Sequence, residues 1–362
     1  MSKVIRVELG ARSYDIHAGA DLLGSCGGVC RKLKLGSRCL IVSDSNVAPL
    51  YAHVIRDSLT DAGFQPSIFI VPAGEESKDS LTLSLIYDEA LAHALDRKSF
   101  IVALGGGVIG DLAGYAAASF LRGIRFVQVP TSLMAMVDSS VGGKTGINLP
   151  QGKNLVGAFH QPSAVLADLV TLSTLPDREF ISGLSEVMKY GVIQDAEFFA
   201  FLEKKAGKIL ARDPETLEQV VTRCCKCKAE VVGLDERESG LRAILNFGHT
   251  LAHAVEQVAG YGKFLHGEAV AIGMAYAAIL SVSAAGLPGE AAERIINLLG
   301  KFGLPVSVNG LSWNAVRKAM QADKKNTGGA VCFVLAREIG RVEPGIEVKE
   351  DLLEEVWNVI SQ

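Results

Sequence analysis

The sequence has no excess of charge of either sign. Its 362 residues include 36 Lys and Arg against 40 Asp and Glu, which gives a formal net charge of −4. A basic stripe is the electrostatic footprint of a nucleic-acid-binding protein, so its absence from the sequence argues against nucleic acid as a partner. A few lysines and arginines could still converge on a small anion.

Cysteines in a pairing pattern are also lacking. The seven cysteines are odd in number and show no disulfide framework, which predicts a reducing, cytoplasmic environment. The densest group, Cys224-Cys225-Lys226-Cys227, does not have the paired CxxC spacing of structural zinc sites. We therefore expect these thiols to pack against neighbouring elements and not to bind metal.

The sequence also lacks a hydrophobic run suited to a membrane. Residues 1–5 indicate a strand and have no signal-peptide hydrophobic core. Residues 269–285 are strongly apolar, but they are rich in Ala and Gly and short for a bilayer crossing, which indicates a buried helix. The composition, 49% hydrophobic and 21% charged, is that of a soluble globular protein, and the length suggests two domains.

Strand and helix signals alternate in the first half of the chain. Buried strands are predicted at 38–44, 65–71, 100–104 and 125–129, with helices at 48–62 and 81–94 between them. This rhythm predicts a mostly parallel sheet in an α/β nucleotide-binding domain, residues 1–175. Residues 176–362 are predicted to form an all-helical domain, with helices at 179–193, 195–210, 214–232, 244–258 and 267–284.

A glycine-rich turn follows the strand at 100–104. Gly105, Gly107 and Gly110 satisfy GxGxxG, and a helix is predicted from Asp111. Such glycines let a backbone approach a pyrophosphate at a helix N-terminus, although a tight turn with close helix packing is the alternative. No acid lies about twenty residues downstream, so Asp44, which ends an earlier strand, is the better candidate for a ribose hydroxyl.

Two neighbouring segments look like polar, ligand-binding loops. One spans residues 134–148 and contains Asp138 and Lys144, and the other carries Lys153 and Asn154. Two lysines and an amide on adjacent loops suit phosphate oxygens. Either lysine alone would be an ordinary surface residue.

Three histidines suggest a metal site. His249 and His253 lie four residues apart on one predicted helical face, and His266 follows thirteen residues later. Thr250 occupies the place of the general-base Glu in an HExxH protease, so that class is excluded. HxxxH alone is a weak signal, and a third ligand, ideally a carboxylate from elsewhere, is needed. Glu186 and Lys189 read by themselves as a surface ion pair.

Seven segments, taken in order, resemble the 3-dehydroquinate synthase family. They are residues 72–78 (PAGEESK), 105–111 (GGGVIGD), 138–144 (DSSVGGK), 153–159 (KNLVGAF), 186–191 (EVMKYG), 246–250 (NFGHT) and 266–268 (HGE). The resemblance implies a homodimeric enzyme that converts 3-deoxy-D-arabino-heptulosonate 7-phosphate into 3-dehydroquinate and phosphate. Transient oxidation by NAD, β-elimination, re-reduction and an intramolecular aldol closure are the implied steps.

The same resemblance implies the site residues. Zinc or cobalt would be held by Glu186, His249 and His266. The NAD-binding residues would be Asp44, Ala73, Gly74, Glu75, Glu76, Ser77, Lys78, Gly107, Val108, Ile109, Gly110, Asp111, Thr131, Ser132, Lys144, Lys153, Thr171, Leu172, Ser173 and Thr174. The substrate phosphate would be held by Lys144, Asn154, Asn246, His253 and Lys324, its carboxylate by Lys228 and Arg242, and its hydroxyls by Asp138 and Lys189. Arg122 would reach the partner subunit's site.

Departures from the family pattern are small, since Met136 and Ser132 stand where relatives often carry Gln and Thr. Three alternatives remain. A sister cyclase acting on a substrate without a carboxylate would differ at Lys228 and Arg242. A metal-dependent polyol dehydrogenase would release NADH and would not need the phosphate-binding set. A catalytically silent binding protein would be expected to have lost a metal ligand.

Overall fold

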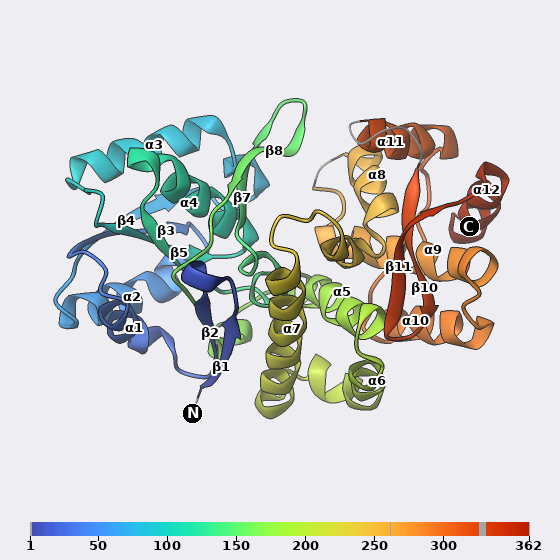
Figure 1. Ribbon diagram of the computed structural model, residues 1–362, viewed down its shortest axis with the longest axis horizontal. Helices are drawn as coiled ribbons and strands as arrows, with labels where there is room; N and C mark the ends of the chain where they lie inside the picture. The colour runs from blue at the N-terminus through green and yellow to red at the C-terminus, as the bar shows by residue number, and fades with distance from the viewer. Residues whose placement is uncertain (1, 261, 326–330, 362) are drawn as a thin grey trace. The chain divides into compact units, whose positions relative to one another are not determined.

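The computed structural model describes residues 2–260, 262–325 and 331–361, and within these it leaves the side chains of 322–325 undescribed (Figure 1). The chain forms two compact units. The first comprises the chain up to Leu175 together with Leu217–Arg237, and the second comprises Pro176–Thr216 and the chain from Glu238 onward. The chain therefore leaves the first unit after Leu175, returns to it at Leu217 and leaves it again after Arg237.

The first unit is built on a seven-stranded sheet in the order β1-β2-β9-β6-β5-β3-β4. Only β1 is antiparallel to its neighbour; the other adjacent pairs are parallel, as expected. Every residue of the interior strand β5 is buried, because helices cover both faces of a parallel sheet and favour a continuous apolar run. The strands are β1 (Lys3–Val7), β2 (Tyr14–Gly19), β3 (Arg38–Asp44), β4 (Gln65–Val71), β5 (Phe100–Gly105), β6 (Arg125–Pro130) and β9 (Ala164–Asp168).

Two helix pairs cover this sheet. On one side α1 (Cys26–Lys32) and α2 (Ala48–Asp61) pack on Ile41, Val102 and Val127, and on the other α3 (Ser80–Ala92) and α4 (Gly107–Ser119) pack on Leu40, Ile101 and Ala103 (Figure 1). The alternating sides of the strands thus feed two separate hydrophobic cores. The segments that follow the strands lie at the carboxyl ends of the sheet, which is where ligands bind in folds of this type.

The two predicted polar loops are ordered differently from the prediction. Ala135–Ser139 forms a short π-helical turn in which Ala135, Met136 and Val137 are buried. Residues 144–159 form a hairpin of β7 (Lys144–Leu149) and β8 (Gly152–Phe159). Its glycines allow the strands to approach, since a Cβ on Gly157 would lie 2.1 Å from the Thr145 carbonyl oxygen. Gly and Asn weaken the alternation that identifies strands, which is why this hairpin read as a loop.

The second unit is helical, with one added hairpin. Its helices are α5 (Asp177–Ile193), α6 (Ala196–Leu210), α8 (His249–Ala259), α9 (His266–Ala285), α10 (Gly289–Lys301), α11 (Trp313–Lys325) and α12 (Glu350–Ile360). The predicted helix at 244–258 begins only at His249, because Leu241–Asn246 forms a 3-10 turn and Gly248 adopts a left-handed conformation at φ 83°. The antiparallel pair β10 (Cys332–Glu338) and β11 (Arg341–Glu347) lies beside α9 and adds two strands to the otherwise helical unit.

Helix α9 is the centre of the second unit. It packs against α5, α8, α10 and β10. Among the described residues it alone has the length and apolar composition of a membrane span, but 72% of that stretch is buried inside the unit, as in the core helix that the sequence predicts. The seven cysteines are all free thiols.

Candidate active site

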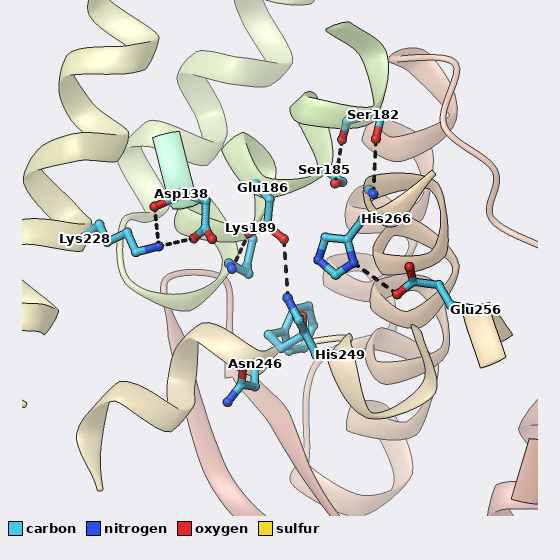
Figure 2. A network of polar contacts seen from close by, with 12 residues as sticks. Asp138, Ser182, Ser185, Glu186, Lys189, Lys228, Asn246, His249, Glu256 and His266 are labelled. Atoms are coloured by element: carbon cyan, nitrogen blue, oxygen red, sulfur yellow. Dashed lines mark hydrogen bonds and ion pairs between the residues drawn. The ribbon is translucent and has the colours of Figure 1, made fainter. Parts of the chain in front are cut away.

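Three side chains of the second unit form a group with metal-binding geometry. Glu186, His249 and His266 each offer a ligand atom, and these atoms all lie within 4.8 Å of one another (Figure 2). Two imidazoles and one carboxylate form a ligand set that catalytic zinc uses in proteins, with further coordination positions left for substrate or water. The carboxylate that the sequence required from elsewhere is therefore present on α5.

Glycine contacts between helices bring the three ligands together. His266 is the first residue of α9, and a Cβ on the next residue, Gly267, would lie 1.9 Å from the Ser182 carbonyl oxygen of α5. His249 is the first residue of α8, and a Cβ on Gly273 of α9 would lie 1.9 Å from the Gly248 carbonyl oxygen. Any larger side chain at these glycines would push apart the helices that carry the ligands.

Glu186 is the most deeply buried of the three ligands. Its side chain is 1% exposed, and neither carboxylate oxygen makes a hydrogen bond. Lys189 Nζ lies against Oε2 as an ion pair, and His249 Nε2 lies 3.5 Å from Oε1. A buried carboxylate with unsatisfied oxygens needs nearby positive charge. The residues present therefore fit a bound divalent metal ion.

Both histidines of the group are held through Nδ1. His249 Nδ1 lies 3.3 Å from the Phe247 carbonyl oxygen, and His266 Nδ1 lies 3.1 Å from Glu256 Oε2. Nε2 is then the nitrogen of each ring that can bind a metal. Burial, and after it the charge of Lys189, hold the pKa of His249 well below its ordinary value. The ring is thus kept in the neutral form that metals require.

His253 and Glu268, which belong to the same sequence motifs, lie near this group but are not part of it. The His253 ring lies 5.6 Å from that of His249 and 6.2 Å from that of His266, so a third imidazole borders the group without belonging to it. Glu268 caps α9: Oε2 accepts from the Leu265 amide at 2.9 Å, and Arg178 donates to both oxygens at 2.7 and 2.8 Å. The group with metal-binding geometry thus contains His249 and His266 and leaves out His253, and the Glu of HGE supports the helix start.

The other predicted residues of the second unit lie near the start of α8. Arg242 and Asn246 belong to the 3-10 turn Leu241–Asn246, and Arg242 is only 2% exposed. Asn246 Nδ2 donates to Glu238 Oε1 at 2.8 Å. Lys189, one turn along α5 from Glu186, is also buried. The side chain of Lys324 lies outside the described residues.

In the first unit, the glycine-rich turn starts α4 earlier than predicted. The helix begins at Gly107, not at Asp111, with Gly106 as its N-cap. A Cβ on Gly110 would lie 2.8 Å from Gln128 Oε1, and one on Gly105 would lie 2.8 Å from Ile109 Cγ1. Close packing therefore accounts for these two glycines. Gly106 and Gly107 leave the helix N-terminus, where anions bind, without bulky side chains.

Residues predicted to bind NAD surround this helix start. Asp44 Oδ1 accepts from the amides of Asn46 and Val47 at 2.8 and 3.0 Å, and its Oδ2 would lie 3.3 Å from a Cβ on Gly105. Thr131 donates its amide to the Gly105 carbonyl oxygen at 3.0 Å. Ser132 Oγ, which faces Gly106, accepts from the Ala135 amide at 3.2 Å. Asp44 is thus placed beside the turn, as a ribose-binding acid would be.

Lys78 connects three of the predicted segments. Its Nζ donates to Asp111 Oδ2 and to Asn154 Oδ1, each at 2.5 Å, and the side chain is 5% exposed. Glu75 Oε1 accepts from Asn148 Nδ2 at 2.7 Å, so the loop before α3 is tied to the hairpin twice. Burial raises the pKa of Asp111 and the charge of Lys78 opposes that rise.

The remaining predicted residues are placed as follows. Lys228 of α7 (Pro214–Leu234) donates to the Asp138 carbonyl oxygen and to Asp138 Oδ1, both at 2.6 Å (Figure 2). Thr171–Thr174 lie in and just after the 3-10 turn Leu169–Ser173, where Thr174 Oγ1 is 2.6 Å from the Tyr51 hydroxyl. Ala73, Gly74, Glu76 and Ser77 form the loop after β4, Val108 and Ile109 lie in the first turn of α4, Lys144 and Arg122 are exposed, and Lys153 is half-buried.

Sequence reasoning missed Glu256, which holds His266, and Glu238, which holds Asn246. Glu256 lies on α8 seven residues after His249, so both are on one helical face. That spacing was the available signal. It was not distinctive, because a Glu seven residues from a His is common on any surface helix.

Comparison with known proteins gives consistent results. Residues 68–182 match the family model described as 3-dehydroquinate synthase N-terminal, and residues 183–326 match 3-dehydroquinate synthase C-terminal. The chain is 52% identical over 337 residues to 3-dehydroquinate synthase of Pelobacter propionicus, covering 93% of this chain and 94% of that one. It is 49% identical over 359 residues to the protein of the same name from Desulforamulus reducens, covering 99% of both.

Solved structures share the fold. A 2-epi-5-epi-valiolone synthase from Streptomyces hygroscopicus with NAD+ and Zn2+ bound superposes with a TM-score of 0.89 at 29% identity, covering 98% of this chain and 97% of that one. A 2-deoxy-scyllo-inosose synthase complexed with carbaglucose-6-phosphate, NAD+ and Co2+ gives 0.88 at 27% identity, covering 98% and 99%. The two family models together span most of the sequence and the curated relatives match nearly all of it, so the chain belongs to the 3-dehydroquinate synthase family.

Proposed function

We propose that this chain is an NAD- and metal-dependent 3-dehydroquinate synthase of the shikimate pathway. It would convert 3-deoxy-D-arabino-heptulosonate 7-phosphate into 3-dehydroquinate and inorganic phosphate. The observation that carries the proposal is the identity of about half the residues over 93–99% of the chain to relatives of that name. The group of Glu186, His249 and His266, in which the carboxylate is buried and the histidines are partly exposed, supports it independently, because it supplies the metal site that such a reaction uses.

In the proposed mechanism the metal and NAD supply the chemistry, and the protein side chains bind and position these cofactors and the substrate. Glu186, His249 and His266 would hold the metal, and the turn at Gly106–Gly107 with Asp44, Lys78 and Thr131 would hold NAD. When bound, the metal would lower the pKa of substrate hydroxyls, and NAD would supply the transient oxidation that acidifies the carbon–hydrogen bond next to the new ketone. The remaining NAD-binding assignments are those that the family resemblance implies.

The proposed substrate contacts fall into three sets. Lys144, Asn154, Asn246, His253 and Lys324 would bind the phosphate and stabilise its charge as it leaves. Lys228 and Arg242 would bind the carboxylate, for which the planar guanidinium of Arg242 is well shaped. Asp138 and Lys189 would orient hydroxyls. In the structure Lys228 is bonded to Asp138, so a bound carboxylate would compete for its ammonium group.

The test is phosphate release from the heptulosonate phosphate with NAD and zinc supplied, while absorbance of NADH is followed. Equal amounts of phosphate and dehydroquinate without net NADH would support the proposal. Turnover of a carboxylate-free sugar phosphate in place of the heptulosonate would make the chain a sister cyclase. Accumulation of NADH from a simple polyol would make it a dehydrogenase, a class whose fold is related: a glycerol dehydrogenase from Schizosaccharomyces pombe superposes with a TM-score of 0.69 at 17% identity.

The proposal includes a cytoplasmic homodimer. The seven free thiols suit a reducing compartment. Arg122, exposed and in a left-handed conformation at φ 68°, is the residue proposed to reach the partner subunit's site. Light scattering coupled to gel filtration would measure the oligomeric state. If the protein is a dimer, Arg122→Ala should lower turnover while the dimer mass measured by light scattering stays that of the wild type.

A further inference from the structure

Glu256 is a buried acid whose hydrogen-bond partner in the structure is a metal ligand. It lies on α8, its side chain is 6% exposed, and its Oε2 is 3.1 Å from Nδ1 of His266 on α9. A buried acid costs stability unless it is paired, so its presence calls for hydrogen-bonding partners. His266 is one such partner.

The contact determines which nitrogen of His266 meets a metal. An ionised carboxylate can only accept a hydrogen bond, so Nδ1 carries the proton and donates. Nε2 then keeps its lone pair and lies on the side of the ring nearer to Glu186. Figure 2 shows the imidazole of His266 between the carboxylates of Glu256 and Glu186, which agrees with the distances.

The two ligating histidines are not held equally. His249 Nδ1 meets a neutral backbone carbonyl at 3.3 Å, whereas His266 Nδ1 meets a carboxylate at 3.1 Å. A carboxylate partner makes the imidazole a stronger electron donor than a carbonyl partner does. The side chain of His266 is also 40% exposed, so fewer packing contacts fix its ring. His266 therefore depends on Glu256 for its orientation more than His249 depends on the Phe247 carbonyl.

We propose that Glu256 is a positioning residue of the metal centre. It holds His266 in the tautomer and orientation that bind the ion, and it raises the affinity for metal without being a ligand itself. This inference rests on the proposed function, because it requires that Glu186, His249 and His266 hold a metal.

The experiment measures zinc affinity in the free, metal-stripped protein by competition with a chromophoric chelator. Glu256→Ala removes both the hydrogen bond and the charge, and should weaken zinc binding about 10- to 100-fold. Glu256→Gln keeps an acceptor oxygen but not the charge, so its loss of affinity should be smaller. With Co2+ in place of zinc, the visible absorption bands of both variants should shift, because the donor strength of one ligand has changed.

Ser281→Ala is the control for a general loss of stability. Ser281 is also on α9 and buried, and its Oγ accepts from the Ala336 amide at 2.9 Å. This variant should have a lower Tm but wild-type zinc affinity and the wild-type Co2+ spectrum. If Glu256→Ala does not fold, Glu256→Gln carries the test through the same two readouts.

The outcomes separate the inference from the proposed function. Wild-type zinc affinity and an unchanged Co2+ spectrum in the Glu256 variants would overturn the positioning role while leaving the metal site intact. Equal weakening in Ser281→Ala would also overturn it, because the effect would then be one of stability. A wild-type protein that binds no zinc would overturn the proposed function together with this inference.

Discussion

The two units differ in how the polar side chains of their candidate binding residues are paired. In the first unit the candidate ligand-binding side chains are already paired with one another, as Lys78 is with Asp111 and Asn154, and Lys228 with Asp138. In the second unit the buried Glu186 forms an ion pair with Lys189, and its two carboxylate oxygens make no hydrogen bond. The first unit therefore joins several polar side chains in a hydrogen-bonded network, whereas the second holds one buried ion pair beside two histidines, a group whose geometry suits a metal ion.

The mode of construction differs as well. The first unit places Asp44, Gly105 and Thr131 at or just beyond the carboxyl ends of adjacent parallel strands, so the sheet sets their positions. The second unit places His249 and His266 at the first residues of two helices. Their positions depend on how closely α5, α8 and α9 approach, which glycine contacts determine. Helix spacing should therefore be the sensitive variable in the second unit, and charge pairing in the first.

Removal of a metal ligand should have the largest effect. His266→Ala should abolish stoichiometric zinc binding and lower turnover about a thousandfold or more, since a metal contributes several kcal/mol to transition-state stabilisation. Metal content by mass spectrometry and a phosphate-release assay measure the two effects. His53→Ala, at an exposed position of α2, is the control and should change neither. Full activity in His266→Ala would remove this residue from the metal site.

Breaking the Lys78 network should cost about 3–5 kcal/mol of stability, because Lys78→Met leaves Asp111 with an unpaired charge. Burial already raises the pKa of Asp111 above its ordinary 3.8, and the loss of Lys78 should raise it further. A carboxyl group whose pKa is higher in the folded state than in the unfolded state lowers the free energy of unfolding as pH rises through that pKa. The loss of stability in Lys78→Met should therefore be largest at neutral pH and become smaller in acid. Urea unfolding at several pH values measures this. A deficit independent of pH would show that lost packing, not charge, is responsible.

Changing helix spacing should have the next largest effect. In Gly267→Ala the new Cβ would meet the Ser182 carbonyl oxygen at 1.9 Å, so α5 and α9 must separate. We expect a loss of about 1–3 kcal/mol in unfolding free energy, together with weaker zinc binding. The matched control is Gly207→Ala on α6, where nothing lies within 4 Å of the new Cβ, and which should gain about 0.5–1 kcal/mol. If both variants behave alike, helix spacing does not control the ligands.

Removing the cap of α9 should have the smallest effect. Glu268→Ala loses the bond from the Leu265 amide and the exposed pair with Arg178, at a cost of about 1 kcal/mol. Zinc stoichiometry should stay at the wild-type value because Glu268 is not in the ligand group. Thermal unfolding and metal analysis test both points. Loss of zinc in this variant would contradict the distinction between Glu268 and its neighbour His266.

What the sequence could predict follows from how local each signal is. The strand at 100–104 was predicted correctly because the pattern that identifies it lies within the strand itself. The start of α4 at Gly107 was placed four residues late, because glycines are weak helix formers and their role here is close packing. The buried π-helical turn at Ala135–Ser139 read as a loop because it is flanked by small polar residues and glycines.

The group of Glu186, His249 and His266, by contrast, could not be predicted from any local pattern in the sequence. Glu186 precedes His249 by more than sixty residues, and no periodicity links them, so only the family resemblance named the carboxylate. The residues themselves favoured a surface ion pair for Glu186 and Lys189, whereas both are buried. Packing of α5 against α9 decided this, and such packing cannot be read from the local pattern of either helix. Glu256 had no distinctive signal because its meaning comes from a residue on another helix.

The return of the chain to the first unit has a consequence during synthesis. Translation produces Pro176–Thr216, which belongs to the second unit, before Leu217–Arg237, which completes the first. Until α7 is synthesised, the surface of the first unit that it covers is exposed. That surface includes Met136, which is buried in the complete fold and whose carbonyl oxygen accepts a hydrogen bond from Cys225. Ribosomes that stall between these segments would release a chain with one incomplete unit and a fragment of the next. Quality-control proteases and chaperones should meet such chains more often than they would for a protein divided cleanly at one position.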